Sequence, residues 1–186
     1  MRSRSSTHGF SLIELMAVVA IILILAAVSV PAIGRSLALY RLNNAAAQVS
    51  NIIQRGRYEA IKQNTTMRVR RDVADGLPRF FVDLDNDGAW QANEPMVLLP
   101  GQIDLLEGGE APDGATLNLG AVSESPEVIA FDGRGTVEFG GGGTSAYAFY
   151  LGYSSQVDYG FRAVGVSPMG RTRVYRAAHG GQWSAQ

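Results

Sequence analysis

The amino-terminal part of the chain carries one long apolar run. Residues 15–34 contain no charged side chain, and Glu14 stands directly in front of them. A helix needs about 20 apolar residues to cross the hydrocarbon core of a bilayer, so this run is long enough to span a membrane once. Arg2 and Arg4 precede the run, and basic flanks stay in the cytoplasm. We therefore expect a transmembrane helix over residues 10–34, with the rest of the chain across the membrane.

Beyond this run the apolar positions repeat at intervals of three and four residues, the spacing of one face of a helix. They are Leu39, Leu42, Ala46, Val49, Ile53, Ala60 and Ile61. Residues 35–64 are therefore predicted to continue the helix as an amphipathic segment packed on a globular domain. Pro31 removes a backbone donor and favours a kink, and Gly34 and Gly56 weaken the helix locally. We expect the helix to end at QNTT (residues 63–66), after roughly 80 Å.

From residue 65 to 186 the pattern changes to short apolar or alternating runs separated by Gly, Pro, Asn and Asp. The runs are MRVRRDV, RFFVDL, MVLLP, QIDLLE, ATLNLG, VIAFDGRGTVEF, AYAFYLGY, YGFRAVGV and RTRVYRA. Such spacing is typical of antiparallel strands, with DGRG as a hairpin turn and FGGGGTS as a flexible loop. The predicted fold class is α+β: a long amino-terminal membrane-spanning helix packed on a carboxyl-terminal antiparallel β-sheet or β-sandwich head.

The amino-acid composition limits the classes of function that this chain can have. The 16 Lys and Arg residues nearly balance the 17 Asp and Glu residues, for a net charge of −1, so nucleic acid would have to meet a local basic patch. The absence of cysteine excludes disulfides, zinc–thiolate sites and a cysteine nucleophile. His8 and His179 lie near opposite ends of the chain, and FGGGGTS lacks the lysine of a phosphate loop. We therefore do not expect an enzyme.

A cleavable secretory signal is one alternative for the amino terminus, since it also combines a basic start with an apolar stretch. Its apolar stretch is about 7–15 residues long and is followed by a small-residue cleavage site. Here the run is longer and begins with the junction HGFSLIELM. AAVSVPAIG (residues 26–34) still offers small residues for such a cleavage, so this alternative stays open.

The junction HGFSLIELM resembles the class III signal of type IV pilins and type II secretion pseudopilins, through Gly9, Phe10 and Glu14. The resemblance implies that residues 1–9 are a leader peptide, which a prepilin peptidase removes after Gly9 before methylating the new amino-terminal Phe10. Glu14 would then be the fifth residue of the mature chain and Pro31 the twenty-second, positions that this family characteristically fills with these residues.

The resemblance also implies a role for Glu14. A charge in lipid costs about 2.5–3.5 kcal/mol on insertion scales unless it finds a partner. In the family the acid is thought to meet the methylated amino terminus of a neighbouring subunit, which makes Glu14 and Pro31 assembly positions. The implied partners are the prepilin peptidase, other pilins or pseudopilins and the inner membrane, with the amino terminus cytoplasmic and the head periplasmic. A tolerated acid near the interface is the plainer alternative.

DLDNDGAWQANE (residues 83–94), here named the acidic loop, carries the first candidate site of the head. Five of its residues match D-x-[DN]-x-[DN]-G-x5-E, the pattern of a calcium loop. They are Asp83, Asp85, Asp87, Gly88 and Glu94. The three aspartates and Glu94 are therefore candidate calcium ligands. The flanking runs RFFV and PMVLL predict strands rather than EF-hand helices, so a plain Asx-rich turn is the alternative. A similar pattern is common in H-type pseudopilins and FimT-like minor pilins.

GRTRVYR, near the carboxyl terminus, carries the second candidate site. On a strand, Arg171, Arg173 and Tyr175 share one face, so two guanidiniums beside an aromatic ring are placed to hold the phosphates of DNA. The alternative is an edge strand that its arginines protect against unwanted pairing. The Gly-Arg-x-Arg pattern resembles a feature of FimT-like minor pilins that is implicated in DNA binding during uptake.

Together these features resemble the GspH/FimT group of minor pilin-like proteins. The function implied is that of a structural subunit at the tip of a type II secretion pseudopilus. The alternative is a FimT-like minor pilin of a type IV pilus, acting in assembly priming or in DNA binding and uptake. A signal-anchored periplasmic binding protein unrelated to pili is a third possibility, which requires Gly9, Phe10, Glu14 and Pro31 to coincide by chance.

Overall fold

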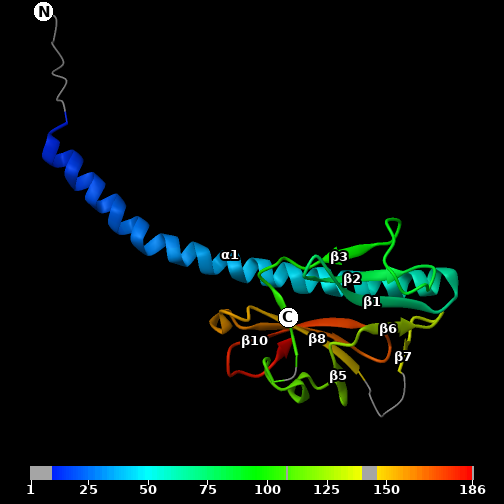
Figure 1. The fold of residues 1–186 in the computed structure, drawn as a ribbon. Helices are drawn as coiled ribbons and strands as arrows, with labels where there is room; N and C mark the ends of the chain where they lie inside the picture. The colour runs from blue at the N-terminus through cyan, green and yellow to red at the C-terminus, as the bar shows by residue number, and fades with distance from the viewer. Residues whose placement is uncertain (1–9, 108, 140–145, 186) are drawn as a thin grey trace, which may run out of the picture. The chain divides into compact units, whose positions relative to one another are not determined.

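The computed structural model describes residues 10–107, 109–139 and 146–185. The predicted leader, Gly9 included, and residues 140–145 of the predicted loop FGGGGTS lie outside them. A long helix, α1 (Leu12–Gln63), is followed by short strands (Figure 1). The chain forms two compact units, Met1–Ala38 and Leu39–Gln186, and α1 begins in the first and ends in the second.

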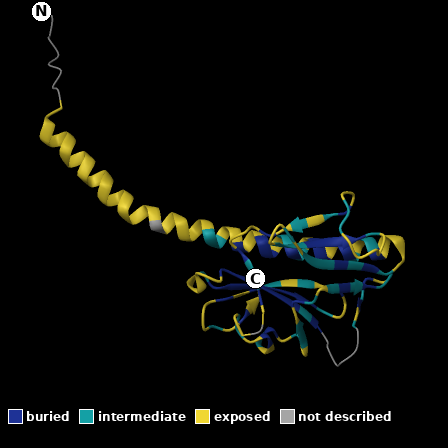
Figure 2. Cartoon of the chain, viewed as in Figure 1, coloured by how far each residue is buried: buried dark blue, intermediate teal, exposed yellow. Residues whose placement is uncertain are grey.

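The described part of the first unit is helix that exposes its apolar side chains. The α1 helix begins after Ser11, whose backbone oxygen accepts from the Glu14 N–H at 3.1 Å and whose side-chain Oγ lies 3.4 Å from the same nitrogen. The large apolar side chains from Leu12 to Ile33 are 45–79% exposed (Figure 2). The helix runs without a break through Pro31, so this residue does not end it.

In the second unit the predicted apolar stripe of α1 packs on the strands. Its buried positions are Leu42, Ala46, Val49, Ile53 and Ala60, joined by Ala45, Ile52 and Gly56. Leu39 is half-buried, whereas Ile61 is exposed, so the prediction that Ile61 belongs to the buried stripe is wrong. Ile61 lies in the last turn of the helix and borders the turn at Gly135, where an added Cβ would lie 2.6 Å from its Cδ1. The helix ends at Gln63, within the predicted segment QNTT (residues 63–66).

The strands form two sheets. The first contains β1 (Met67–Ala74), β2 (Leu77–Asp83), β3 (Met96–Leu98), β6 (Val128–Phe131) and β7 (Val137–Glu138), in the order β3-β2-β1-β6-β7. The second contains β4 (Asp104–Leu106), β5 (Val122–Glu124), β8 (Ala146–Gly152), β9 (Phe161–Val166), β10 (Thr172–Ala177) and β11 (Ser184–Ala185). Its order is β11-β10-β9-β8-β4, with β5 also paired to β8. In the described part of the chain, two 3-10 turns lie between strands: η1 (Gly114–Leu117) between β4 and β5, and η2 (Val157–Tyr159) between β8 and β9.

Most of the predicted strands are confirmed, and three features differ: the turn η1, the strand β5 and the short strand β11, which was not predicted. The run ATLNLG is not a strand but the turn η1, because the Asp113 side chain accepts from the Ala115 N–H at 2.9 Å and Asn118 closes the turn at a φ of 56°. The sequence did not predict β5, which pairs with β8 in parallel and so departs from a wholly antiparallel head. The hairpin at DGRG is confirmed as β6–β7.

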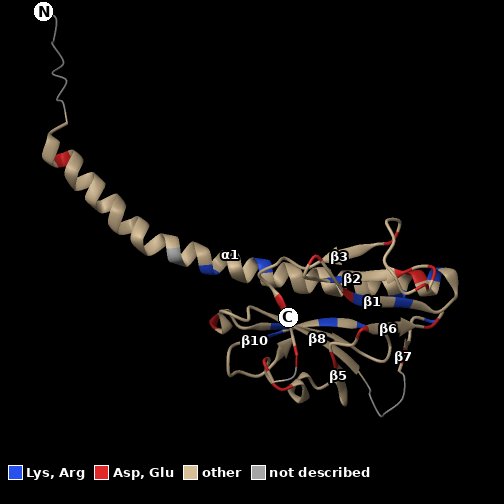
Figure 3. Cartoon of the chain, in the orientation of Figure 1, with Lys and Arg blue, Asp and Glu red and all other residues tan. Residues whose placement is uncertain are grey.

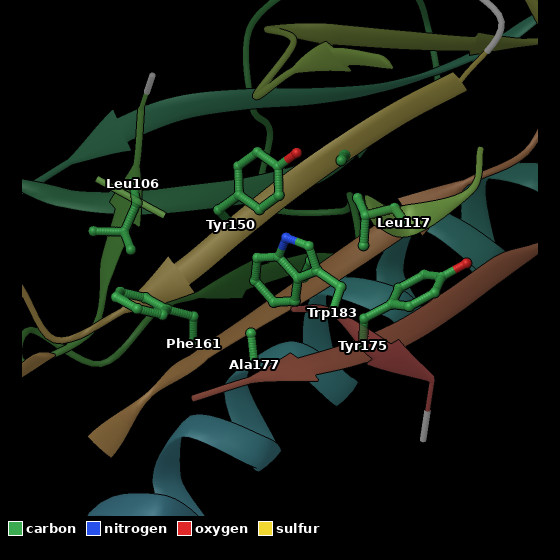
Figure 4. Close-up of a cluster of buried hydrophobic side chains, with 9 residues drawn as sticks. Leu106, Leu117, Tyr150, Phe161, Tyr175, Ala177 and Trp183 are labelled. Atoms are coloured by element: carbon green, nitrogen blue, oxygen red, sulfur yellow. The ribbon is translucent and has the colours of Figure 1, made fainter. Parts of the chain in front are cut away.

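The second sheet presents opposite faces to two different surroundings. On one face, Thr172 contacts Ser50 of α1 through their hydroxyls at 2.8 Å, and Arg162 donates from Nε to Asn43 Oδ1 at 2.6 Å. On the opposite face, the alternate residues of β8, β9 and β10 belong to a buried hydrophobic cluster, shown in Figure 4. Its labelled members are Leu106, Leu117, Tyr150, Phe161, Tyr175, Ala177 and Trp183. η1 and the carboxyl-terminal segment therefore cover the sheet face that α1 does not.

Candidate functional site

The start of α1 holds the residues predicted for processing and assembly. Phe10 is 81% exposed, and Glu14 lies in the first helical turn, where the partial positive charge of the helix end favours an acid. The Ser11 cap was not predicted, although the spacing S-x-x-E of Ser11 and Glu14 is a helix-start signature. The Glu14 side chain is exposed, and among the described residues its carboxylate has no hydrogen-bond or ion-pair partner.

The helix behind Glu14 is apolar on every side. By length and composition, α1 is long and apolar enough to cross a membrane. Figure 3 shows the uncharged stretch of the helix that follows its first acidic residue. A helix that is apolar on all sides is normally buried in a protein core or in a bilayer and is not left exposed to water. This part of the chain is therefore suited to a membrane, or to packing against similar helices.

In the acidic loop, three of the four predicted calcium ligands come together. Asp83 ends β2, and carboxylate oxygens of Asp83, Asp85 and Asp87 all lie within 4.8 Å of one another. Gly88 follows at a φ of +87°, in the left-handed region that glycine adopts without strain. The Ala89 N–H and the Gln91 side-chain amide hold the pKa of Asp87 below its usual range, which keeps this carboxylate charged.

Glu94, the fourth predicted ligand, does not join this group. It is buried, and its two oxygens accept from the backbone: Oε1 from the Leu84 N–H at 2.6 Å and Oε2 from the Gln91 N–H at 3.0 Å. Trp90 donates from Nε1 to the Glu94 carbonyl at 3.3 Å. These bonds tie the two ends of the loop together, which the pattern of a calcium loop did not predict.

Arg171 and Arg173 lie on a groove of about 420 Å³ at the edge of the second sheet. Tyr175 also lines this groove, as the strand period predicted, together with η1 and Trp183. Both arginines are exposed, and neither has an ion-pair partner among the residues described. Tyr175 is only 6% exposed and belongs to the buried cluster, so it supports the groove rather than offering a free aromatic face.

Catalytic groups do not gather in the described part of the chain. His179 is exposed, and its ring lies 6.2 Å from that of Phe161, while His8 lies outside the described residues. Among the described residues, the acids and histidines that lie close enough to share a metal ion are the three aspartates of the acidic loop. The candidate sites of the chain are thus an assembly segment, an acidic loop and a basic groove.

Two family models match parts of this chain. The prokaryotic N-terminal methylation motif matches residues 4–30, and the model of the type II transport protein GspH matches residues 45–170. A search of curated proteins finds no match. Among solved structures, the chain is similar to the type IV minor pilin FimU of Pseudomonas aeruginosa (strain PAO1). The TM-score is 0.49 and the identity 16%, over 78% of this chain and 92% of that chain. The family match covers more than half of the chain and the methylation motif its start, so the chain belongs to the GspH family of type II transport proteins.

Proposed function

We propose that the chain is a structural subunit, not an enzyme, at the tip of a type II secretion pseudopilus. Its amino terminus lies in the cytoplasm, α1 crosses the inner membrane, and the head lies in the periplasm. The match to the GspH family over residues 45–170 supports the type of filament. The observation that carries the proposal is the combination of a methylation motif with Glu14, an acid that has no partner among the described residues and lies at the front of an exposed apolar helix.

Assembly in this proposal is mechanical. A prepilin peptidase removes residues 1–9 and methylates Phe10, which creates a positive amino terminus near the start of α1. When subunits pack helix against helix, Glu14 of one subunit pairs with the amino terminus of its neighbour. The pairing offsets the desolvation that both charges undergo in an apolar surrounding, and removing one partner leaves the other charge uncompensated.

The test replaces Glu14. Glu14→Ala and Glu14→Gln should insert in the membrane at least as well as the natural chain, because each removes a charge that costs about 2.5–3.5 kcal/mol in lipid. Both should be strongly depleted from sheared filaments, while Ser11→Ala, which weakens the helix cap but keeps the acid, should still enter. Equal recovery of Glu14→Gln and the natural chain in filaments would overturn the assembly role.

A second function, DNA capture by a type IV minor pilin, is favoured by the basic groove. Arg171 and Arg173 are exposed along one groove without acidic partners among the described residues. Phosphate contacts position DNA without reading its sequence, so the full-length chain in detergent should bind duplexes of any sequence weakly. Two or three contacts predict a log–log salt slope of roughly −2 to −3.

The DNA test compares two double variants of equal charge. Arg171→Gln with Arg173→Gln should weaken binding and flatten the salt slope, whereas Arg55→Gln with Arg134→Gln, which removes two exposed arginines elsewhere, should change little. Electrophoretic or fluorescence titrations over a range of salt concentrations give both quantities. An equal loss in the two double variants would mean that binding follows net charge and not the groove.

A further inference from the structure

One oxygen of the acidic loop is left without a partner. Asp83 is fully buried; its Oδ2 accepts from Arg70 Nε at 2.5 Å and from the Gly88 N–H at 3.2 Å. Its Oδ1 is buried and has no hydrogen-bond partner in the described chain. Leaving a buried carboxylate oxygen without a donor or a cation is energetically unfavourable. The Asp83 Oδ1 can therefore still accept a hydrogen bond or bind a cation.

Two further carboxylates meet Asp83 at this point. Oxygens of Asp83, Asp85 and Asp87 lie within 4.8 Å of one another. Calcium binds oxygen at about 2.3–2.6 Å, so two oxygens on opposite sides of one ion lie at most roughly 5 Å apart. The three aspartates are thus close enough for one calcium ion to contact an oxygen of each.

The positive groups around the loop do not balance these acids. Arg70 pairs with Asp83, and Arg68 donates from Nη1 to Asn86 Oδ1 at 2.6 Å rather than to one of the three aspartates. The exposed pair is bridged by a neutral donor, since Gln91 Nε2 lies 2.6 Å from Asp85 Oδ2 and 2.9 Å from Asp87 Oδ2. An ion that binds the exposed pair, Asp85 and Asp87, must displace this side-chain amide.

We infer that Asp83, Asp85 and Asp87 form a weak calcium site in which Glu94 is not a ligand but holds the loop closed. Glu94 is committed to the Leu84 and Gln91 amides, so the ion takes its remaining ligands from backbone oxygens and water. Calcium suits this irregular set better than magnesium, which requires a near-octahedral shell and gives up its water reluctantly. The inference is independent of the filament to which the chain belongs.

Calorimetric titration of the full-length chain in detergent tests the site. Calcium should bind with a Kd on the order of 10⁻⁴–10⁻³ M, typical of extracellular modules, and magnesium at least about tenfold more weakly. At ten times the Kd, calcium should raise Tm by roughly 3–6 °C. Asp85→Asn and Asp87→Asn alter exposed side chains, so they should fold normally and bind calcium at least about tenfold more weakly. Asp75→Asn, in the β1–β2 turn, is the matched control and should bind as the natural chain does.

The role of Glu94 is tested separately. Glu94→Gln should lower Tm without calcium, because one backbone amide loses its acceptor, while the rise in Tm on adding calcium persists. The reverse result would overturn the inference: if Glu94→Gln left Tm unchanged without calcium and calcium no longer raised its Tm, Glu94 would be a ligand. It is also overturned if the natural chain shows neither heat nor a Tm shift at about 10 mM calcium, or if Asp85→Asn and Asp87→Asn bind as well as the natural chain.

Discussion

Gly56 shows how one residue determines the approach of the helix to the first sheet. It is buried in α1, and a Cβ added to it would lie 2.2 Å from Val69 Cγ2 and 3.7 Å from Val82 Cγ2. From the sequence, Gly56 was expected only to weaken the helix. The structure gives the reason for its presence, because the close contact between α1 and β1 leaves no room for a side chain.

We expect Gly56→Ala to destabilise the head. Replacing glycine by alanine favours the helix by about 1 kcal/mol, but overpacking a filled core costs about 1–3 kcal/mol. The β-branched Val69 cannot relieve the clash easily, because its side chain has few alternative rotamers. The net loss should reach up to about 2 kcal/mol in urea unfolding of the full-length chain. In a Val69→Ala background the same change should be neutral or stabilising, a coupling that a double-mutant cycle measures. Stabilisation in the natural background would contradict the close contact.

Single residues differ in how far the sequence reveals them. The convergence of Asp83, Asp85 and Asp87 follows from their alternation around one tight turn, so spacing alone indicated it. The position of Glu94 did not follow, because the choice between an ion and the Leu84 amide depends on how the loop folds back on β2. The exposure of Ile61 was missed for a similar reason: periodicity indicates a face of the helix, but not where the sheet beneath it ends.

At the scale of elements, the β6–β7 hairpin is held by the side chain that begins its turn. Asp132 Oδ1 accepts from the Arg134 N–H at 2.9 Å and the Thr136 N–H at 2.8 Å, and Oδ2 accepts from the Thr136 hydroxyl at 2.8 Å. These donors favour the charged carboxylate and lower the pKa of Asp132, with the Thr136 N–H as the largest cause. We therefore expect acid to weaken the hairpin.

The sign of this dependence follows from the lowered pKa. The stabilisation by Asp132 is fully present at pH values above its pKa in the unfolded chain, which is near 3.9. It is lost as the pH falls through the lower pKa that Asp132 has in the folded chain. We expect the natural chain to exceed Asp132→Asn in stability at pH 7, and the difference to shrink below about pH 4. Urea midpoints of both chains measure it, and the other carboxylates cancel in the comparison. Thr136→Val, which removes only the hydroxyl donor, should show a smaller effect. A difference that is constant with pH would contradict this role of Asp132.

Elements built from neighbouring residues were the ones that the sequence predicted. The β6–β7 hairpin depends on a turn whose residues are adjacent, and α1 on a period that repeats along the chain. The parallel pairing of β5 with β8 joins Val122 to Ala146, across a segment that includes a further hairpin, and no local pattern indicates it. The turn η1 was mistaken for a strand because ATLNLG alternates as a strand does, although Asp113 in front of it can cap a turn.

At the scale of the whole molecule, contacts between distant residues hold the second unit together without disulfides. Arg162 of β9 is 7% exposed and donates to Asn43 of α1, 119 residues away, and from Nη1 to the Phe161 carbonyl at 2.8 Å. Burial, and then the nearby Arg176, lowers the pKa of Arg162. The carboxyl-terminal end contributes as well, since Trp183 stacks on Tyr150 at 5.5 Å and donates from Nε1 to the Pro112 carbonyl at 3.0 Å. The sequence predicted the helix and the head, but not these links.

We expect this pilin-like chain to enter a filament through a processed amino terminus. Co-expression with a prepilin peptidase, followed by intact-mass measurement of the membrane fraction, tests it most directly. We predict that the natural chain loses residues 1–9 and gains one methyl group on Phe10, while Gly9→Ala stays largely uncleaved. A chain that keeps its full mass, or one cut near Ala32 as a secretory signal would be, would contradict the account.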